Sequence, residues 1–80
     1  MAYDDLEPSQ RRSLVRAIRD GLIAKNVGTV TLNDPLGGSA AARAHMDAAW
    51  IFDSGWANRT EAGWSVDIDT YLIQPWPRKR

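Results

Sequence analysis

The cationic side chains of this sequence are concentrated in one short stretch, where their spacing could serve to bind an anion. Residues 11–26 carry five of the ten Lys and Arg side chains. With a helical period, Arg12, Arg16 and Arg19 share one face, and guanidinium groups bind both phosphates and carboxylates bidentately. Ile23 falls on the same face and would add an apolar contact. The spacing therefore predicts either a contact surface for an anionic partner or a solvated helix face.

A second candidate surface is acidic. Apolar and polar side chains alternate through residues 64–73, which predicts a half-buried strand with Asp67, Asp69 and Tyr71 on its outer face. Two carboxylates beside a tyrosine would suit a basic partner, since aromatic side chains are enriched at interface hot spots. The same alternation is also what the wet face of any half-buried strand shows.

The C-terminal residues combine an aromatic ring with cations. Trp76 stands between two prolines and is followed by Arg78 and Arg80. Aromatic and arginine side chains together are typical of single-strand nucleic-acid binding, whereas an unattached terminus is commonly frayed. We expect an extended tail at 75–80 beyond a single α+β domain at 1–74.

Metal and catalytic chemistry find little support in the residue types. The chain has no cysteine and one histidine, which excludes disulfides and thiolate metal sites. His45 and Asp47 would point about 200° apart on a helix, so they cannot share one ion. We therefore predict no catalytic residue, no metal ligand and no cofactor, and we do not expect an enzyme.

Length and composition favour one small domain in a reducing compartment. Eighty residues with seven aromatic side chains argue for a packed core rather than disorder. Without cysteine, a signal peptide or a membrane span, a cytoplasmic location is expected. The net charge is zero, although residues 1–10 carry −3 and residues 11–25 carry +4. A neutral total makes a protein partner the first expectation and nucleic acid the second.

Helical periodicity predicts the element that carries the arginines. Pro8 suits the first turn of a helix, and Asn26 suits a left-handed stop. Gly21 weakens the helix by about 1 kcal/mol relative to alanine, but the apolar phase continues through it. The stripe predicted to face the core consists of Leu14, Val15, Ile18 and Leu22.

The remaining elements follow from composition. Alternation predicts a short strand at 29–32, followed by a Gly-rich loop. Ser39 can cap an alanine-rich helix at 40–52. A helix that ends near Met46, followed by a strand at 50–52, is the alternative.

Residues 56–64 predict a β-hairpin with its turn at 60–63 and with Trp56 and Trp64 as cross-strand neighbours. The fold class is therefore α+β, with two helices packed on a small, mostly antiparallel β-sheet in the order α-β-α-(β)-β.

In general make-up the chain resembles the small orphan proteins of bacteriophages and mobile elements. Anti-CRISPR inhibitors are similar to it in size and in lacking recognisable sites, and no motif assigns functional positions. The resemblance implies a non-enzymatic inhibitor in the cytoplasm of a bacterial host. Such a protein binds a nucleoprotein complex, for example a CRISPR effector, and blocks nucleic-acid binding or nuclease recruitment. We expect a monomer or weak dimer; direct nucleic-acid binding and a structural or assembly role in a phage are the alternatives.

Overall fold

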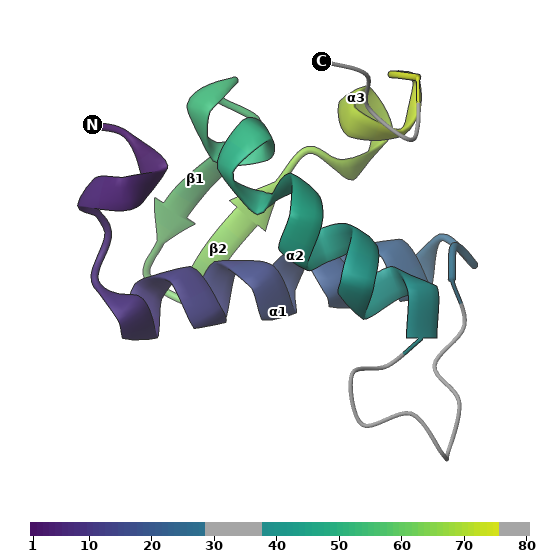
Figure 1. The fold of residues 1–80 in the computed structure, drawn as a ribbon, viewed down its shortest axis with the longest axis horizontal. Helices are drawn as coiled ribbons and strands as arrows, with labels where there is room; N and C mark the ends of the chain where they lie inside the picture. Colours follow the sequence, from purple (N-terminus) through teal and green to yellow (C-terminus); the bar gives the residue numbers. More distant parts are fainter. Residues whose placement is uncertain (29–37, 76–80) are drawn as a thin grey trace.

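The computed structural model describes residues 1–28 and 38–75, which form helices around a short β-hairpin (Figure 1). The elements are η1 (a 3-10 turn, Tyr3–Asp5), α1 (Pro8–Ala24), α2 (Gly38–Asp53), β1 (Ala57–Thr60), β2 (Gly63–Val66) and α3 (Ile68–Leu72). The predicted α+β class is confirmed, with two main helices and an antiparallel pair of strands in these ranges. The strand predicted at 29–32 lies outside the described residues. No helix among the described residues is long and apolar enough to cross a membrane.

The first helix, α1, begins and ends where its sequence predicts. Pro8 occupies the first turn, where its missing N–H costs no hydrogen bond. At the other end Asn26 adopts a left-handed φ of 61°. The N–H of Val27 donates to the carbonyl of Leu22 at 2.8 Å, and that of Asn26 to Ile23 at 2.9 Å. This pair of bonds is a Schellman motif, which satisfies carbonyls that the helix end leaves open.

The second helix, α2, is continuous, so the alternative of a helix that ends near Met46 is wrong. Ser39 lies inside α2 rather than at its cap. The helix stops through Gly55, whose φ is 82°, and the N–H of Trp56 donates to the carbonyl of Ile51 at 3.1 Å. A continuous helix is favoured over a strand at 50–52 because the helical period places a row of small side chains on one face, where they are completely buried. That row consists of Ala40, Ala44 and Ala48.

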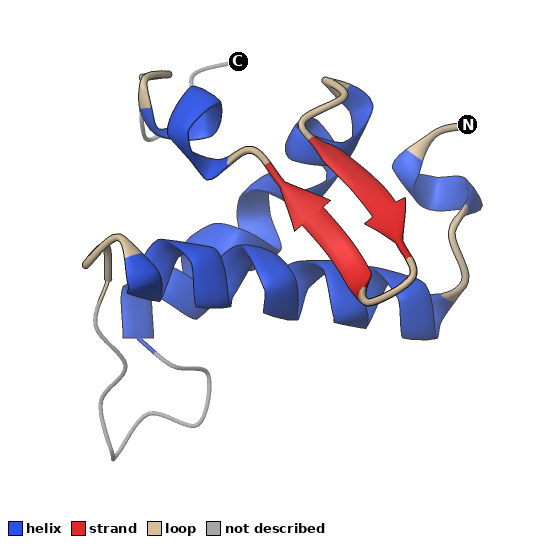
Figure 2. Cartoon of the chain, turned by 180° about the vertical axis from the view of Figure 1, so that it is seen from behind, coloured by secondary structure: helices blue, strands red, loops and turns tan. Residues whose placement is uncertain are grey.

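This alanine row of α2 packs on α1, and the hairpin lies against the helix pair, with β2 next to α1 and β1 next to α2 (Figure 2). Opposite the alanines, three predicted core positions of α1 have no exposed surface: Leu14, Ile18 and Leu22. Methyl side chains allow the two helix backbones to approach closely, as ridges-into-grooves packing requires. The core is therefore built on contact between a row of large side chains and a row of small ones.

The hairpin turns at the predicted residues but pairs different side chains. Thr60 pairs with Gly63, and Arg59 stands opposite Trp64 with its guanidinium carbon 5.7 Å from a ring centroid. Trp56 precedes β1 and packs edge-on against Trp50 at 5.4 Å. The predicted Trp56–Trp64 cross-strand pair is therefore wrong, because the register sets Arg59 opposite Trp64 and the carbonyl of Trp56 accepts from the N–H of Asp67.

The strand predicted across 64–73 is confirmed only as far as Val66. Asp67 accepts a hydrogen bond from the N–H of Thr70 at 3.1 Å and begins α3. Its other oxygen accepts from the Thr70 hydroxyl at 2.6 Å. Aspartate is a preferred helix cap, and here the cap ends the extended backbone. Ile68 and Tyr71, three residues apart, then face inward together.

Close approach of α3 to α1 depends on Gly21. A Cβ at this position would lie 2.7 Å from Cγ1 of Ile68, which is shorter than real Cβ contacts allow. The glycine that weakens α1 by propensity therefore gives Ile68 its place in the core.

We expect Gly21→Ala to destabilise the fold, although in a solvent-exposed helix alanine is more favourable than glycine by about 1 kcal/mol. Overpacking against Ile68 costs about 1–3 kcal/mol and should outweigh that gain. Urea unfolding followed by tryptophan fluorescence measures the change. In an Ile68→Ala background the same substitution should become stabilising, because the clash is gone. An equal loss in both backgrounds would contradict this interpretation.

Candidate functional site

An open groove of about 250 Å³ lies between α1 and α2. Its walls and floor come from both helices. The residues that line it are Arg12, Val15, Arg16, Arg19, Ala41, Ala42 and His45. The structure thus brings the three predicted arginines to one site and adds α2 residues that the sequence did not associate with them. We call this site the arginine groove.

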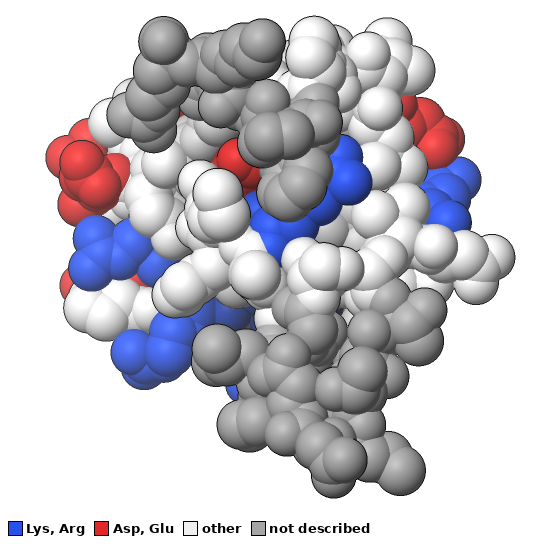
Figure 3. Space-filling model, turned by 45° about the vertical axis from the view of Figure 1, so that its right-hand side comes forward, with Lys and Arg blue, Asp and Glu red and all other residues white. Residues whose placement is uncertain are grey.

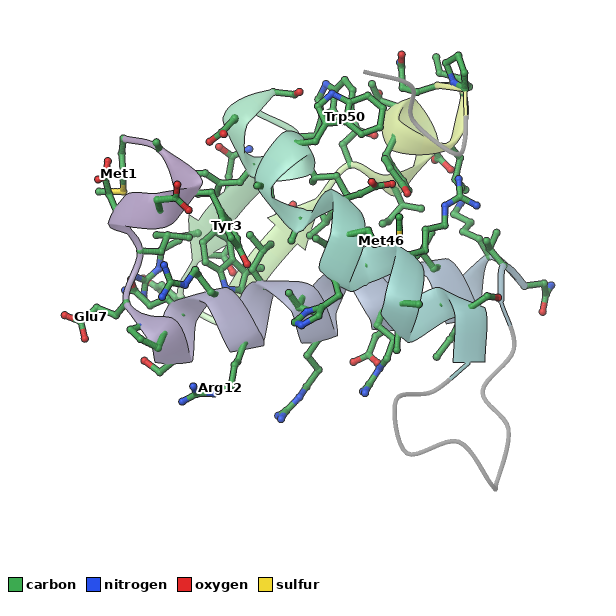
Figure 4. The ribbon with its side chains drawn as sticks, viewed as in Figure 1. Met1, Tyr3, Glu7, Arg12, Met46 and Trp50 are labelled. Atoms are coloured by element: carbon green, nitrogen blue, oxygen red, sulfur yellow. The ribbon has the colours of Figure 1, made fainter. Side chains whose placement is uncertain are left out.

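One wall of the arginine groove is formed by three arginine residues along α1. Positions i, i+4 and i+7 stack on one helix face, so Arg12, Arg16 and Arg19 follow one another over two turns. Arg12 and Arg16 are exposed, whereas Arg19 is half-buried. Figure 4 shows Arg12 extending from α1 away from the body of the molecule. The row can therefore reach an external ligand without any change in the core.

The floor of the arginine groove is apolar and is made of small side chains. Val15 comes from α1, and Ala41 and Ala42 come from α2. His45, exposed on α2, borders the groove from the other side. In the space-filling view, basic side chains lie beside uncharged surface (Figure 3). A ligand here would meet cations and an apolar surface together.

The charges of the arginine groove are only partly balanced. Arg19 pairs with Asp20, with Nη2 and Oδ1 at 3.1 Å, and the Asp20 side chain is 61% exposed. Asp20 also lies four residues after Arg16 but pairs with Arg19 instead. Within residues 1–28 and 38–75, neither the Arg12 nor the Arg16 side chain makes an ion pair or hydrogen bond. Since exposed pairs contribute only about 0–1 kcal/mol, an incoming anion can compete for all three arginines.

Ile23 does not take the place that the helical wheel predicts. The groove ends at Arg19, one turn earlier, and Ile23 packs against the core. Ile23 is partly buried and does not line the groove beside the arginines. Its part in partner binding stays a prediction.

The predicted acidic face is also not assembled. Asp67 caps α3, and Asp69 pairs with Lys25 at 2.9 Å. Tyr71 is only 1% exposed. These three residues share no outer face because the backbone is helical where a strand was predicted. The predicted tail residues lie outside the described residues: Trp76, Arg78 and Arg80.

A buried polar network replaces that face, and sequence reasoning missed it. The hydroxyl of Tyr71 donates to Oδ2 of Asp47 and accepts from Nε of Arg43 at 2.8 Å. Trp50 packs edge-on against the Tyr71 ring at 5.9 Å, beside α3 in Figure 4. The signal in the sequence was the Arg43/Asp47 pair, the polar edge of an apolar helix. A spacing of four residues also suits an exposed ion pair on a helix, but Asp47 is only 5% exposed.

Burial and the bond to Asp47 strongly disfavour ionisation of Tyr71. Burial, followed by the carboxylate as acceptor, raises the pKa of Tyr71 to about 12. The hydroxyl is therefore a proton donor to Asp47 at every physiological pH. Such a donor allows a carboxylate to be buried at acceptable cost.

No cluster of three or more potential metal ligands occurs in the part of the chain that the structure describes. Comparison with protein-family models, curated proteins and solved structures finds no match to this chain. Any ligand for the arginine groove can therefore be proposed only from the shape and charge of the groove.

Removal of the Tyr71 hydroxyl tests the network. We expect Tyr71→Phe to lower the free energy of unfolding by about 1–3 kcal/mol, because buried Asp47 loses a hydrogen-bond donor. Urea titration measures the change. Tyr3→Phe is the matched control, since the Tyr3 hydroxyl makes no hydrogen bond in the described residues and should be worth little. Equal losses in the two variants would contradict a special role for Tyr71.

The raised pKa of Tyr71 also predicts a dependence of stability on pH. The ordinary value is 10.0 and the folded value about 12, so the unfolded state releases the proton first. The shift in the pKa of Tyr71 contributes about 2–3 kcal/mol to the free energy of unfolding. This contribution is complete below pH 10 and is lost as the pH rises from 10 to 12. We expect wild type to lose stability relative to Tyr71→Phe over this range in urea titrations. If the free energy of unfolding had the same pH dependence in the two proteins, the raised pKa of Tyr71 would be contradicted.

Proposed function

We propose that this chain is a non-enzymatic binding protein that holds an acidic segment of a partner protein in the arginine groove. The observation that carries the proposal is the meeting of Arg12, Arg16 and Arg19 over an apolar floor. Arginine suits such a role because its planar fork binds carboxylates bidentately and is less strongly hydrated than an ammonium group. Cations at the wall would orient the segment, and apolar contact at the floor would add affinity.

Direct nucleic-acid binding is the alternative, and two observations make it second. A phosphate backbone gains nothing from a floor of Val15, Ala41 and Ala42. The chain is also neutral overall, whereas nucleic-acid-binding domains are commonly basic. A partner that carries both carboxylates and apolar side chains uses the whole site.

The resemblance to anti-CRISPR inhibitors favours a nucleoprotein effector of a bacterial host as the larger machine. An acidic segment held by the arginine groove would place this small chain on the effector. From there it could block the path of nucleic acid or the docking of a nuclease. The supporting features are the size, the make-up and the site geometry, and the proposed location is the host cytoplasm.

The proposal predicts arginine-dependent binding of a simple acidic chain. We expect Arg12→Glu/Arg16→Glu/Arg19→Glu to weaken binding of a 20-residue polyglutamate by at least about tenfold, because three favourable contacts become repulsive. Fluorescence anisotropy measures the affinity. Arg59→Glu, an exposed position on β1, is the matched control and should change it little.

A 20-nucleotide oligothymidylate serves as the competing probe. If its binding exceeds that of polyglutamate and depends on the same arginines, the alternative function replaces the proposed one. Such binding should weaken with salt at a logarithmic slope of about −2 for three neutralised phosphates. Equal melting curves by circular dichroism show that the charge variants remain folded.

A further inference from the structure

The spacing of the arginines and the shape of the floor specify the conformation of the bound segment. We infer that the arginine groove takes an acidic amphipathic α-helix, which lies along α1 and α2. Its carboxylates face Arg12, Arg16 and Arg19, and small or aliphatic side chains beside them rest on the floor. This inference depends on the proposed function and specifies the partner of the same site.

The first support is the spacing of the charges. Four residues separate Arg12 from Arg16, and three separate Arg16 from Arg19, which gives rises of about 6 Å and 4.5 Å. A helix that runs along α1 repeats these steps with acids at i, i+4 and i+7, or at i, i+3 and i+7 when it runs the other way. In an extended segment, same-face residues are about 6.8 Å apart, so the third carboxylate lies about 3 Å beyond Arg19. A helix therefore matches all three cations.

The second support is the floor between the two helices. Ala41 and Ala42 present only methyl groups, and Val15 is short, so a third helix can approach both α1 and α2. The buried alanines on the inner side of α2 have the same effect, since α1 packs closely there. Helices pack by setting a ridge of side chains into such a groove. An apolar strip next to an acidic strip defines an amphipathic helix, and helix-in-groove binding is a recurring mode of recognition.

The third support is the size of the site. The volume of about 250 Å³ is below the roughly 300–1,000 Å³ typical of small-molecule pockets, and the groove is open. It has room for one or two aliphatic side chains from a larger ligand. A helix supplies these at fixed positions next to its acids, while the rest of it stays outside the groove.

Three labelled 18-residue peptides of one composition and one charge test the inference. The register peptide has glutamates at i, i+4 and i+7 beside a strip of alanine and leucine. The alternating peptide has its glutamates at every second position, to match an extended chain. The proline peptide keeps the glutamate register, but its terminal proline and a central residue are exchanged. Proline in the middle of a helix costs about 3 kcal/mol, so this peptide cannot form the helix.

We expect the register peptide to bind wild type at least about tenfold more tightly than the other two, by fluorescence anisotropy. Its circular dichroism should gain helical signal on binding. Ala42→Trp, which fills the floor at an exposed position, should weaken binding of the register peptide more than binding of polyglutamate. The triple arginine-to-glutamate variant should bind none of them, and Arg59→Glu should behave as wild type.

The outcomes separate the inference from the proposed function. If all three peptides bind equally and depend on the arginines, the groove takes acids of any conformation; the inference fails while the function stands. If no acidic peptide and no polyglutamate bind, both fail. Preferential binding of oligothymidylate through the same arginines overturns the inference in favour of a nucleic-acid ligand.

Discussion

Close contact between α1 and α2 is the constraint on which the other features depend. The contact surface of α2 is a row of fully buried methyl groups: Ala40, Ala44 and Ala48. Small side chains bring the two backbones together but bury little apolar area each. Aromatic side chains complete the core, among them Trp50 against Trp56 and Phe52 against Trp64. The close packing of α2 on α1 also sets the outer face of α2 beside the arginines of α1. A single helix–helix contact therefore produces both the core and the groove.

The short helix α3 is held by its neighbours rather than by its own propensity. A five-residue helix is far below the length at which an isolated helix persists. Ile68 fits over Gly21, and Tyr71 reaches Asp47 and Arg43 on α2. These contacts join α3 to both main helices. The network is costly to bury but fully hydrogen-bonded, since no buried side-chain polar atom of the described residues lacks a partner.

What the sequence could predict was local, and what it missed was long-range. The start and end of α1 follow from Pro8 and Asn26, residues that act on their own backbone. Over 68–72, a period of two places Ile68 and Leu72 inward, whereas a helical turn places Ile68 and Tyr71 inward. Both sets are apolar or aromatic, so the pattern alone could not decide between them. The deciding contacts were the Asp67 cap and the space over Gly21, and the second comes from another part of the chain. Likewise, α1 alone predicts a row of arginines, whereas the floor of the groove needed the position of α2.

Stability alone does not account for the charge pattern on α1. Arg12 and Arg16 are four residues apart, and like charges at that spacing repel by roughly 0.2–0.5 kcal/mol. The nearest carboxylate along the helix, Asp20, pairs with Arg19 and leaves this repulsion unrelieved within the described residues. The buried stripe of α1 faces the opposite way, so the repulsion does nothing for the core. The carboxylates of an acidic ligand would attract both arginines and offset the repulsion between them. Relief of this repulsion would then contribute to the affinity for the ligand.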